Sequence, residues 1–238
     1  MNAPLKEPLA VLVSGGLDSA VLLGTAAREH TTVHPIFIRS GLVWEDVERA
    51  YLDQFLAAIR TQSLAPLTTL ELPVRDLYGD HWSTTGRNTP DAEAGDEQFF
   101  LPGRNVVLLA KALLWCHLHK VPSVAMAVLA ANPFPDATAE FFTTFATAVN
   151  RAVGGSVRIE TPFAALTKAD VVALGRDLPL EHTFSCANPH AGLHCGRCGK
   201  CGERGRAFAV AQVPDPTQYA SDEWRSKTQR PTNRGAWE

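Results

Sequence analysis

The chain has 238 residues, 45% of them hydrophobic, and a formal net charge of -3. This length and composition allow one large core, and the charge and the lack of a long Lys/Arg run count against a general nucleic-acid-binding surface. The first eight residues hold no apolar signal region, and no uncharged apolar run reaches the length of a membrane span. We therefore expect a cytoplasmic protein with no direct nucleic-acid or membrane partner.

The first third of the chain alternates apolar strands with amphipathic helices. Pro35 lies inside the second strand and forfeits a ladder hydrogen bond, so we expect it to face a gap at the start of that strand or a bulge. The pattern predicts, in order, a strand at 9–13, a helix from 17 to about 28, a strand at 33–38, a helix at 44–60 and a strand at 67–70.

Residues 73–98 show neither a helical nor a strand period and collect Gly, Pro, Asp, Thr and Asn, so we expect a long loop over the active face. Beyond it the pattern predicts a helix at 106–119, a strand at 123–128, a helix that ends at 150, a strand at 157–160 and a helix at 168–176. The alternation predicts an α/β fold: a Rossmann-like, doubly wound parallel sheet of five strands, with ligands at the carboxyl ends of the strands.

The stretch Ser14-Gly15-Gly16-Leu17-Asp18-Ser19 lies at the first strand–helix junction. Two glycines allow a sharp turn and bring backbone N–H groups close to a ligand. Ser14, Asp18 and Ser19 add short polar groups at a helix N-terminus, where the dipole favours an anion. An ordinary turn with a Ser/Asp cap is the alternative, and the full six-residue pattern favours phosphate binding.

Four of the five cysteines, Cys186, Cys195, Cys198 and Cys201, lie in one short segment that also contains Arg197 and Lys200. Without a secretion signal a disulfide framework is not expected. Four thiolates with basic neighbours match a closed, structural Zn²⁺ site, and an iron–sulfur cluster is the alternative because its ligands are also thiolates.

The remaining cysteine and the neighbouring histidines are not expected to bind a metal ion. Cys116 lies on a helical pattern and is interpreted as a buried small hydrophobic residue. His182, His190 and His194 lie near the four cysteines and are interpreted as solvated loop residues, because the four thiolates already complete a tetrahedral site.

The six-residue loop resembles the Ser-Gly-Gly-x-Asp-Ser signature of the N-type ATP pyrophosphatases, the PP-loop family, and it lacks the Gly-Lys-Ser/Thr ending of a Walker loop. The resemblance implies an adenine nucleotide alpha hydrolase-like fold whose loop holds the β and γ phosphates of ATP. A substrate oxygen then attacks the α phosphorus and pyrophosphate leaves, which gives an adenylated intermediate.

Further motifs narrow the resemblance: Phe-Leu-Pro-Gly-Arg-Asn at 100–105, the run at 162–175, and Thr-Phe-Ser-Cys at 183–186. From about residue 9 to 210 the chain resembles the 7-cyano-7-deazaguanine synthases of queuosine biosynthesis. The resemblance implies an ATP-dependent ligase that forms C–N bonds. It would adenylate 7-carboxy-7-deazaguanine, use ammonia to form the amide, and activate the amide again to form the nitrile.

The same resemblance assigns roles to individual residues. It implies that Asp18, Ser19 and Lys168 are catalytic, that Lys168 meets a phosphate, and that Arg104 and Asn105 lie beside the site. It implies ATP, Mg²⁺ and Zn²⁺ as cofactors. The loop residues that would hold pyrophosphate and magnesium are Ser14, Gly15, Gly16, Leu17, Asp18 and Ser19, and the zinc ligands would be Cys186, Cys195, Cys198 and Cys201.

The sequence departs from the family's motifs in two segments that are expected to contact the carboxylate substrate. The sequence at 132–138 keeps only the Pro-Asp pair of the family's Asp-Tyr-Ser-Gly-Tyr-Pro-Asp-Cys-Arg segment, and Arg39-Ser40-Gly41 replaces Gln-Arg-His. We take Arg39 and Asp136 as candidate substrate contacts. A divergent enzyme that adenylates another carboxylate, or joins the deazaguanine to a protein amine in a specialised modification or defence system, stays open.

A nucleotide-binding regulatory module without turnover is a third reading, against which the intact Asp18, Ser19 and Lys168 argue. We expect an ATP pyrophosphatase domain at 1–180 and a four-Cys zinc-binding segment, helix and tail at 181–238 packed on it. The expected partners are ATP, ammonia and a small carboxylate, and a homodimer is left open.

Overall fold

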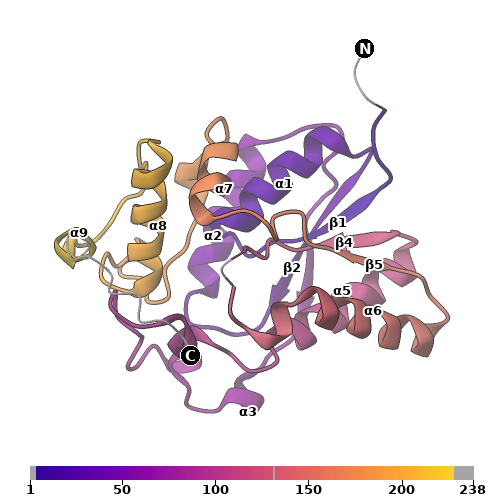
Figure 1. Ribbon diagram of the computed structural model, residues 1–238, viewed down its shortest axis with the longest axis horizontal. Coiled ribbons are helices and arrows are strands. Elements are labelled where there is room, and N and C mark those ends of the chain that lie inside the picture. Colours follow the sequence, from indigo (N-terminus) through magenta and orange to yellow (C-terminus); the bar gives the residue numbers. More distant parts are fainter. Residues whose placement is uncertain (1–3, 131, 228–238) are drawn as a thin grey trace.

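The computed structural model describes residues 4–130 and 132–227. A parallel sheet of five strands in the order β3-β2-β1-β4-β5 forms its centre (Figure 1). The expected five-stranded, doubly wound sheet is confirmed. The strands are β1 (Leu9–Leu12), β2 (Val33–Arg39), β3 (Thr68–Glu71), β4 (Ser123–Ala125) and β5 (Arg158–Glu160).

The strand sequences follow from their positions in the sheet. β1 is central and apolar throughout, and Leu9, Ala10 and Val11 are buried because helices cover both faces. β3 is an edge strand, and its Thr-Thr-Leu-Glu sequence alternates between partly buried and exposed positions. The expected strand at 123–128 ends at Ala125, earlier than the apolar run suggests.

Pro35 pairs with Val11 in the middle of β2. Toward β3, the amide of Val33 donates to the carbonyl of Ser63, and the regular ladder resumes only where Ile36 pairs with Thr68. In a parallel strand, every second residue directs its N–H toward the same neighbouring strand, so Val33 and Pro35 both face β3. The missing N–H of Pro35 therefore lies between the Val33–Ser63 hydrogen bond and the first regular pair, Ile36 with Thr68. The expected placement at a gap is confirmed.

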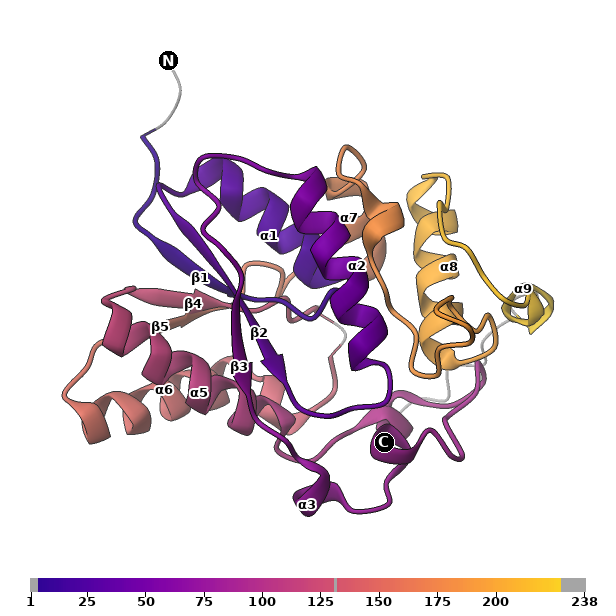
Figure 2. The same ribbon diagram turned by 180° about the vertical axis from the view of Figure 1, so that it is seen from behind.

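The helices form two layers, as Figures 1 and 2 show from opposite sides. One core lies between the sheet and α1, α2 and α7, and it includes Val21, Phe55 and Val172. The other lies between the sheet and α5 and α6, and it includes Leu113 and Phe142. The helices of these layers are α1 (Leu17–Glu29), α2 (Glu45–Ala58), α5 (Arg104–His119), α6 (Ala139–Val153) and α7 (Lys168–Leu174).

The C-terminal part packs on the first of these layers. Helix α8 (Gly199–Ala211) contacts α7, and its Phe208 belongs to the same core as α1. The fifth cysteine, Cys116, is buried in the α5 core as expected, and burial raises the pKa of its thiol to about 12.

The segment 73–98 corrects the expectation of a loop without regular structure. It forms two short helices, each followed by a glycine with positive φ, Gly79 and Gly86. The short elements of the chain are α3 (Arg75–Tyr78), α4 (Trp82–Thr85), the 3-10 helices η1 (Asp96–Phe99), η2 (Pro135–Ala137) and η3 (Leu180–His182), and α9 (Glu223–Lys227).

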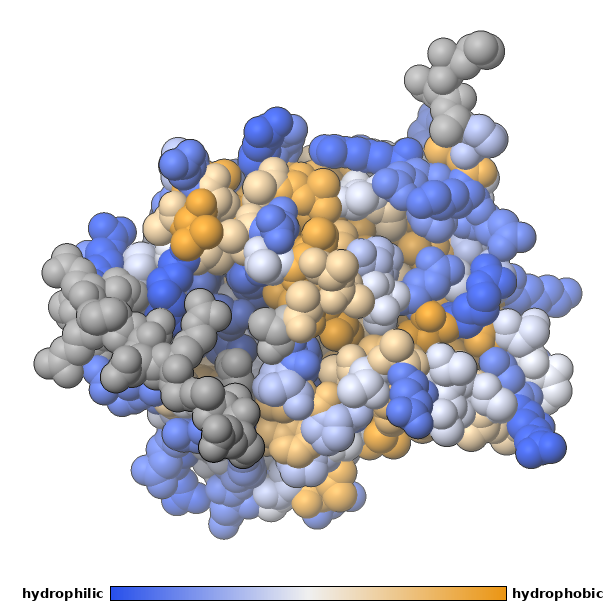
Figure 3. Space-filling view, viewed as in Figure 1, coloured by the Kyte–Doolittle hydropathy of each residue, from blue (hydrophilic) through white to orange (hydrophobic). Residues whose placement is uncertain are grey.

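Among the described residues, none of the helices combines the length and the apolar character that crossing a membrane requires. On the face shown in Figure 3, hydrophobic residues lie among hydrophilic ones and form no single continuous band.

Truncation at one buried position of α5 tests the core beneath the sheet. Leu113 is 1% exposed and Leu118, on the same helix, is 75% exposed. Leu113→Ala leaves a cavity and is expected to lower the free energy of unfolding by about 2–5 kcal/mol. Leu118→Ala is the matched control, with an expected change within about 0.5 kcal/mol. Urea unfolding curves measure both, and equal effects would contradict the assignment of this core.

Candidate functional site

The Ser14–Ser19 loop lies between β1 and α1, at the carboxyl end of the central strand. The chain passes from β1 to β2 on one side and later to β4 on the other, so the loop lies at the switch point of the sheet, where ligands bind in such folds. Gly15 has φ +88, and a Cβ there would lie 2.3 Å from the carbonyl oxygen of Glu48. Only glycine fits this position without strain.

The hydroxyl groups of the loop hold its turn together. The Oγ of Ser14 accepts from the amide of Gly16 at 3.1 Å, and the Oγ of Ser19 accepts from the amide of Ser14 at 3.2 Å and donates to the carbonyl of Gly16 at 3.1 Å. The carbonyl of Gly15 accepts from the amide of Phe184 at 2.8 Å. The segment before Cys186 is thereby hydrogen-bonded to the loop.

Lys168 joins the loop to two helices. It begins α7 after a complete capping box made by Thr167 and Asp170. Its Nζ lies 2.5 Å from Oδ2 of Asp18 and 3.7 Å from Oε1 of Glu203 on α8. Burial alone would lower the pKa of Lys168, but these two carboxylates outweigh it and raise the pKa above its usual value. Lys168 is therefore a protonated cation beside the loop.

Two further observations complete this charge cluster. Lys200 Nζ lies 2.9 Å from Oε2 of Glu203, and although burial opposes ionisation, Lys168 and Lys200 hold the pKa of Glu203 at about 2. The second oxygen of Asp18, Oδ1, is buried without a hydrogen-bond partner among the described residues. A buried, unsatisfied carboxylate oxygen is a free ligand atom for a cation or a donor.

Two cavities meet at the loop. The first, about 260 Å³, lies over the ends of β1, β2 and β4 and is lined by residues such as Phe37, Ile38 and Met126. The second, about 210 Å³, lies between the loop and the cysteine segment. Asn105 lines the first cavity, and Lys168 lines the second. Both cavities are lined by Ser14, Gly16, Asp18, Glu48 and Arg104.

Aromatic rings and cations both line the second cavity. Trp44 and Trp82 are stacked with ring centroids 5.5 Å apart, and Phe99 packs edge-on against Trp82. Lys168 and Lys200 supply the positive charge. A cavity of this kind suits a flat ligand that carries an anionic group.

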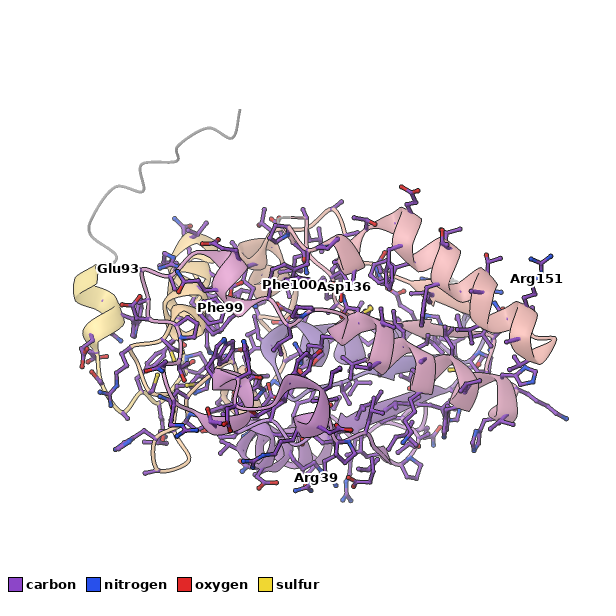
Figure 4. All side chains as sticks on the ribbon, turned by 90° about the horizontal axis from the view of Figure 1, so that it is seen from below. Arg39, Glu93, Phe99, Phe100, Asp136 and Arg151 are labelled. Carbon is purple, nitrogen blue, oxygen red and sulfur yellow. The ribbon has the colours of Figure 1, made fainter. Side chains whose placement is uncertain are left out.

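Arg39 and Asp136, the two candidate contacts to the carboxylate substrate, line neither cavity. Arg39 is paired with Asp46 at 2.5 Å on the outer surface, and Figure 4 shows it at the edge of the molecule. Asp136 is buried, and its Oδ2 accepts from the amide of Asn105 at 3.0 Å while the Asn105 side chain donates to the Asp136 carbonyl at 2.8 Å. Asp136 therefore fixes the start of α5 beside the first cavity.

The four cysteines come together as expected. Cys186, Cys195, Cys198 and Cys201 are all buried, and their sulfur atoms lie within 4.8 Å of one another. Three of the Sγ–Sγ distances are 3.6, 3.8 and 3.9 Å. Backbone amides of Asn188, Cys195, Arg197 and Cys198 donate to these sulfurs, as suits thiolates. The cluster fits a single bound metal ion.

His194 corrects the expectation of a solvated histidine. It is 1% exposed and packs against the rings of Tyr51, Phe184 and Tyr219. Its Nε2 accepts from the amide of Ser185 at 3.0 Å, and burial lowers its pKa to about 2. His194 is therefore a neutral packing residue behind the loop.

Comparison with known proteins shows the family of the chain. The family model described as "Queuosine biosynthesis protein QueC" matches residues 9–212. The chain belongs to the QueC family. It is similar to the 7-cyano-7-deazaguanine synthase of Xanthomonas campestris pv. campestris (strain B100), with 32% identity over 221 residues that cover 88% of this chain and 96% of that protein. The enzyme of the same description from Brucella ovis is 34% identical over 236 residues, which cover 92% and 97%.

Two solved structures also match this QueC-family chain. A predicted subunit of tRNA methyltransferase from Methanocaldococcus jannaschii is 13% identical, with a TM-score of 0.44 and 75% and 92% of the two chains covered. The U34-tRNA thiolase NcsA from Methanococcus maripaludis, with its [4Fe-4S] cluster, is 14% identical, with a TM-score of 0.41 and 88% and 66% covered.

Sequence reasoning missed several charged residues of the site. Glu48 occupies an ordinary polar position of an amphipathic helix, and Glu203 and Arg204 follow the last cysteine on α8. Arg204 is fully buried and donates to Ser185, Thr217 and the carbonyl of Leu180. The available signal was the number of charges that directly follow the cysteines.

Substitutions at two glycines with positive φ distinguish the cost of backbone strain from the cost of crowding at the loop. Gly103 has φ +73 and open space where a Cβ would lie, whereas Gly15 has φ +88 and the Glu48 carbonyl at 2.3 Å. Gly103→Ala is expected to cost about 1–2 kcal/mol of stability from strain alone. Gly15→Ala must also displace the Glu48 carbonyl, and the expected cost exceeds about 3 kcal/mol. Urea denaturation measures both, and similar costs would contradict the close approach of loop and α2.

Proposed function

We propose that the protein is an ATP-dependent ligase that adenylates 7-carboxy-7-deazaguanine and uses ammonia to form the amide and then the nitrile, 7-cyano-7-deazaguanine. The observation that carries this proposal is the meeting of two cavities at a phosphate-type loop in a chain of the QueC family. One cavity offers a place for a nucleotide and the other a place for a flat acid.

The first cavity is suited to the adenosine of ATP, because it lies at the carboxyl ends of the central strands, where nucleotides bind in doubly wound sheets. The phosphates would then lie at the loop, with the start of α1 and Lys168 beside them. Lys168 and Lys200 stabilise the charge that develops on the departing pyrophosphate. In this proposal Ser14, Gly15, Gly16, Leu17 and Ser19 shape the loop around the phosphates.

The buried, unpartnered Oδ1 of Asp18 fits a magnesium ligand, since magnesium binds carboxylate and phosphate oxygens together. A bound Mg²⁺ would neutralise phosphate charge. Asp18 also holds Lys168 by its other oxygen. One carboxylate thus positions the lysine and leaves an oxygen for the cation.

The second cavity is suited to the acid. Its Trp44 and Trp82 rings can cover a planar heterocycle, and Arg104, which lines both cavities, can hold a carboxylate at the point where they meet. The carboxylate oxygen then lies where it can attack the α phosphorus. Asn105 and Asp136 support this arrangement by fixing the helix that carries Arg104.

A second function is favoured by one observation: neither Arg39 nor Asp136, which occupy the altered motifs, lines a cavity. A divergent enzyme could adenylate another carboxylate or join the deazaguanine to a protein amine. Mass spectrometry of the products from 7-carboxy-7-deazaguanine, ATP, magnesium and ammonium decides between them. The nitrile supports the first function, and an adenylate or amide that accumulates supports the second.

The four cysteines are proposed to bind zinc. A tetrahedral ion with Zn–S bonds of about 2.3 Å sets its sulfur atoms about 3.8 Å apart, and the three Sγ–Sγ distances of 3.6 to 3.9 Å match. A multi-iron cluster carries its thiolates on different iron atoms and needs a wider spacing. With all four positions taken by protein, the metal is structural, and it holds the C-terminal segment that begins at residue 181 on the preceding domain. Residues 228–238 of that predicted segment lie outside the described residues.

Asp18→Ala tests the loop as the catalytic centre. Loss of this carboxylate removes the proposed magnesium ligand and frees Lys168, so pyrophosphate release is expected to fall more than about 100-fold. The melting temperature should stay near that of the wild type, because Glu203 remains 3.7 Å from Lys168 as a counter-charge and the buried Oδ1 of Asp18 has no hydrogen bond to lose. Asp53→Ala, at an exposed acid of α2, is the control with unchanged activity. Near-normal pyrophosphate release from Asp18→Ala would refute this role of the loop.

Cys198→Ala tests the metal site. Three remaining thiolates leave an open site, and because metal binding is coupled to folding, bound zinc should fall well below one ion per chain while the segment from residue 181 becomes sensitive to protease. Cys116→Ala removes the buried cysteine outside the cluster and should keep the metal content. Elemental analysis and limited proteolysis measure both. A stable, active Cys198→Ala enzyme without metal would rule out a structural metal.

A further inference from the structure

Glu48 lies at the junction of the two cavities and has no part in the phosphate contacts described above. It comes from α2, lines both cavities, and is partly buried. Its own backbone carbonyl abuts Gly15, which fixes its position relative to the loop. A carboxyl group placed where nucleotide and acid would meet can act on a group that joins them.

Three carboxyl groups line these cavities in the described part of the chain: Asp18, Glu45 and Glu48. Asp18 is paired with Lys168 at 2.5 Å. Glu45 accepts from the backbone amides of Ser40 and Gly41, at 2.6 and 2.8 Å, and thereby holds the turn before α2. These two carboxyl groups already have structural partners.

Glu48 makes fewer interactions than Asp18 and Glu45. It has a side-chain hydrogen bond with Trp44 and feels the positive charge of Arg104, but no salt bridge joins it to a cation within the described residues. With the free oxygen of Asp18 assigned to magnesium in the proposed function, Glu48 is the carboxyl group at the junction that is left for the amine.

We propose that Glu48 is the catalytic base that receives the amine nucleophile and takes its proton. The inference rests on the proposed function, because it needs an acyl-adenylate at the junction. Ammonium is a cation at neutral pH, so the ionised form of Glu48 attracts it, and it must lose a proton before its nitrogen can attack.

The step balances as follows in the first half-reaction. Ammonium gives one proton to Glu48, the nitrogen lone pair forms the C–N bond, and the C–O bond to AMP breaks. The tetrahedral nitrogen then loses a second proton to solvent through the open cavity. The products are the amide and AMP, and Glu48 returns its proton to solvent.

The same base suits the second half-reaction. After the amide oxygen has displaced pyrophosphate from a second ATP, the nitrogen must lose both protons as the C–O bond breaks and the C≡N bond forms. Glu48 takes one and solvent the other. A single group at the junction thus serves both C–N bond changes.

The electrostatic surroundings agree with this role. Burial raises the pKa of Glu48 to about 8, opposed by the charge of Arg104 on α5 and reinforced by Glu45 on its own helix. Asp18 on α1 and Lys168 on α7 line the same space. At this pKa most Glu48 side chains are protonated at pH 7 in the free enzyme, and the ionised form is the one that binds the cation; it accepts a proton from ammonium far better than an ordinary Glu carboxyl, whose pKa is about 4.3.

The test compares Glu48→Gln with Asp53→Asn, the same acid-to-amide change at an exposed position of α2. Three rates are measured: acid-dependent exchange of pyrophosphate into ATP without amine, amide formation from ammonium, and hydroxamate formation from hydroxylamine, which is already neutral at pH 7. For Glu48→Gln we expect exchange and hydroxamate formation within about threefold of wild type, and amide formation reduced about 100-fold or more. Asp53→Asn should resemble wild type in all three.

Several outcomes overturn the inference. Equal losses with ammonium and hydroxylamine would show a role in positioning rather than in proton transfer, and loss of exchange would place Glu48 in the ATP or magnesium site. An unchanged amide rate would show that Glu48 is not the base. The proposed function fails separately, if the wild-type protein shows no exchange with 7-carboxy-7-deazaguanine.

Discussion

The site depends on one crowded contact, in which the backbone of Gly15 lies between the carbonyl of Glu48 and the amide of Phe184. The first neighbour leaves no room for a side chain, and the second donates a hydrogen bond to the Gly15 carbonyl. Through this contact the loop, α2 and the cysteine segment are fixed relative to one another. The loop and α2 line both cavities, and the cysteine segment lines the second, so the shape of the site follows from this contact.

The charges around the loop are arranged to tolerate an anionic ligand. Asp18, Lys168, Glu203 and Lys200 alternate in sign, so that no charge of this cluster is buried alone. Arg204 lies behind them, fully buried, and within the described residues its hydrogen bonds go to neutral oxygens. A tetrathiolate centre with a divalent ion carries net negative charge, and Cys201 lies one turn before Arg204 on α8. A metal bound there would add to the counter-charge that Asp215 already supplies to this buried cation.

The sequence predicted the parts of this structure that depend on local rules. The alternating periods predicted the five parallel strands and a helix from residue 168, and four close cysteines predicted the cluster. Residues whose surroundings come from distant segments were missed. Glu48 has the spacing of a solvated helical face, and it is enclosed by segments far away in the chain, among them the loop and Arg104. His194 looks like a loop residue until the rings of Tyr51, Phe184 and Tyr219 enclose it.

The ion pair between Asp18 and Lys168 joins residues 150 positions apart in the chain, and the Gly15–Phe184 hydrogen bond spans a still longer interval. During synthesis on the ribosome, β1, the loop and α1 emerge early, long before α7 and the cysteine segment can reach them. Contacts of such long range also form late in folding, because the intervening chain must first be ordered. A nascent or truncated chain would therefore carry the complete loop sequence without a working site, and competence for nucleotide chemistry would arrive together with the metal-bearing end.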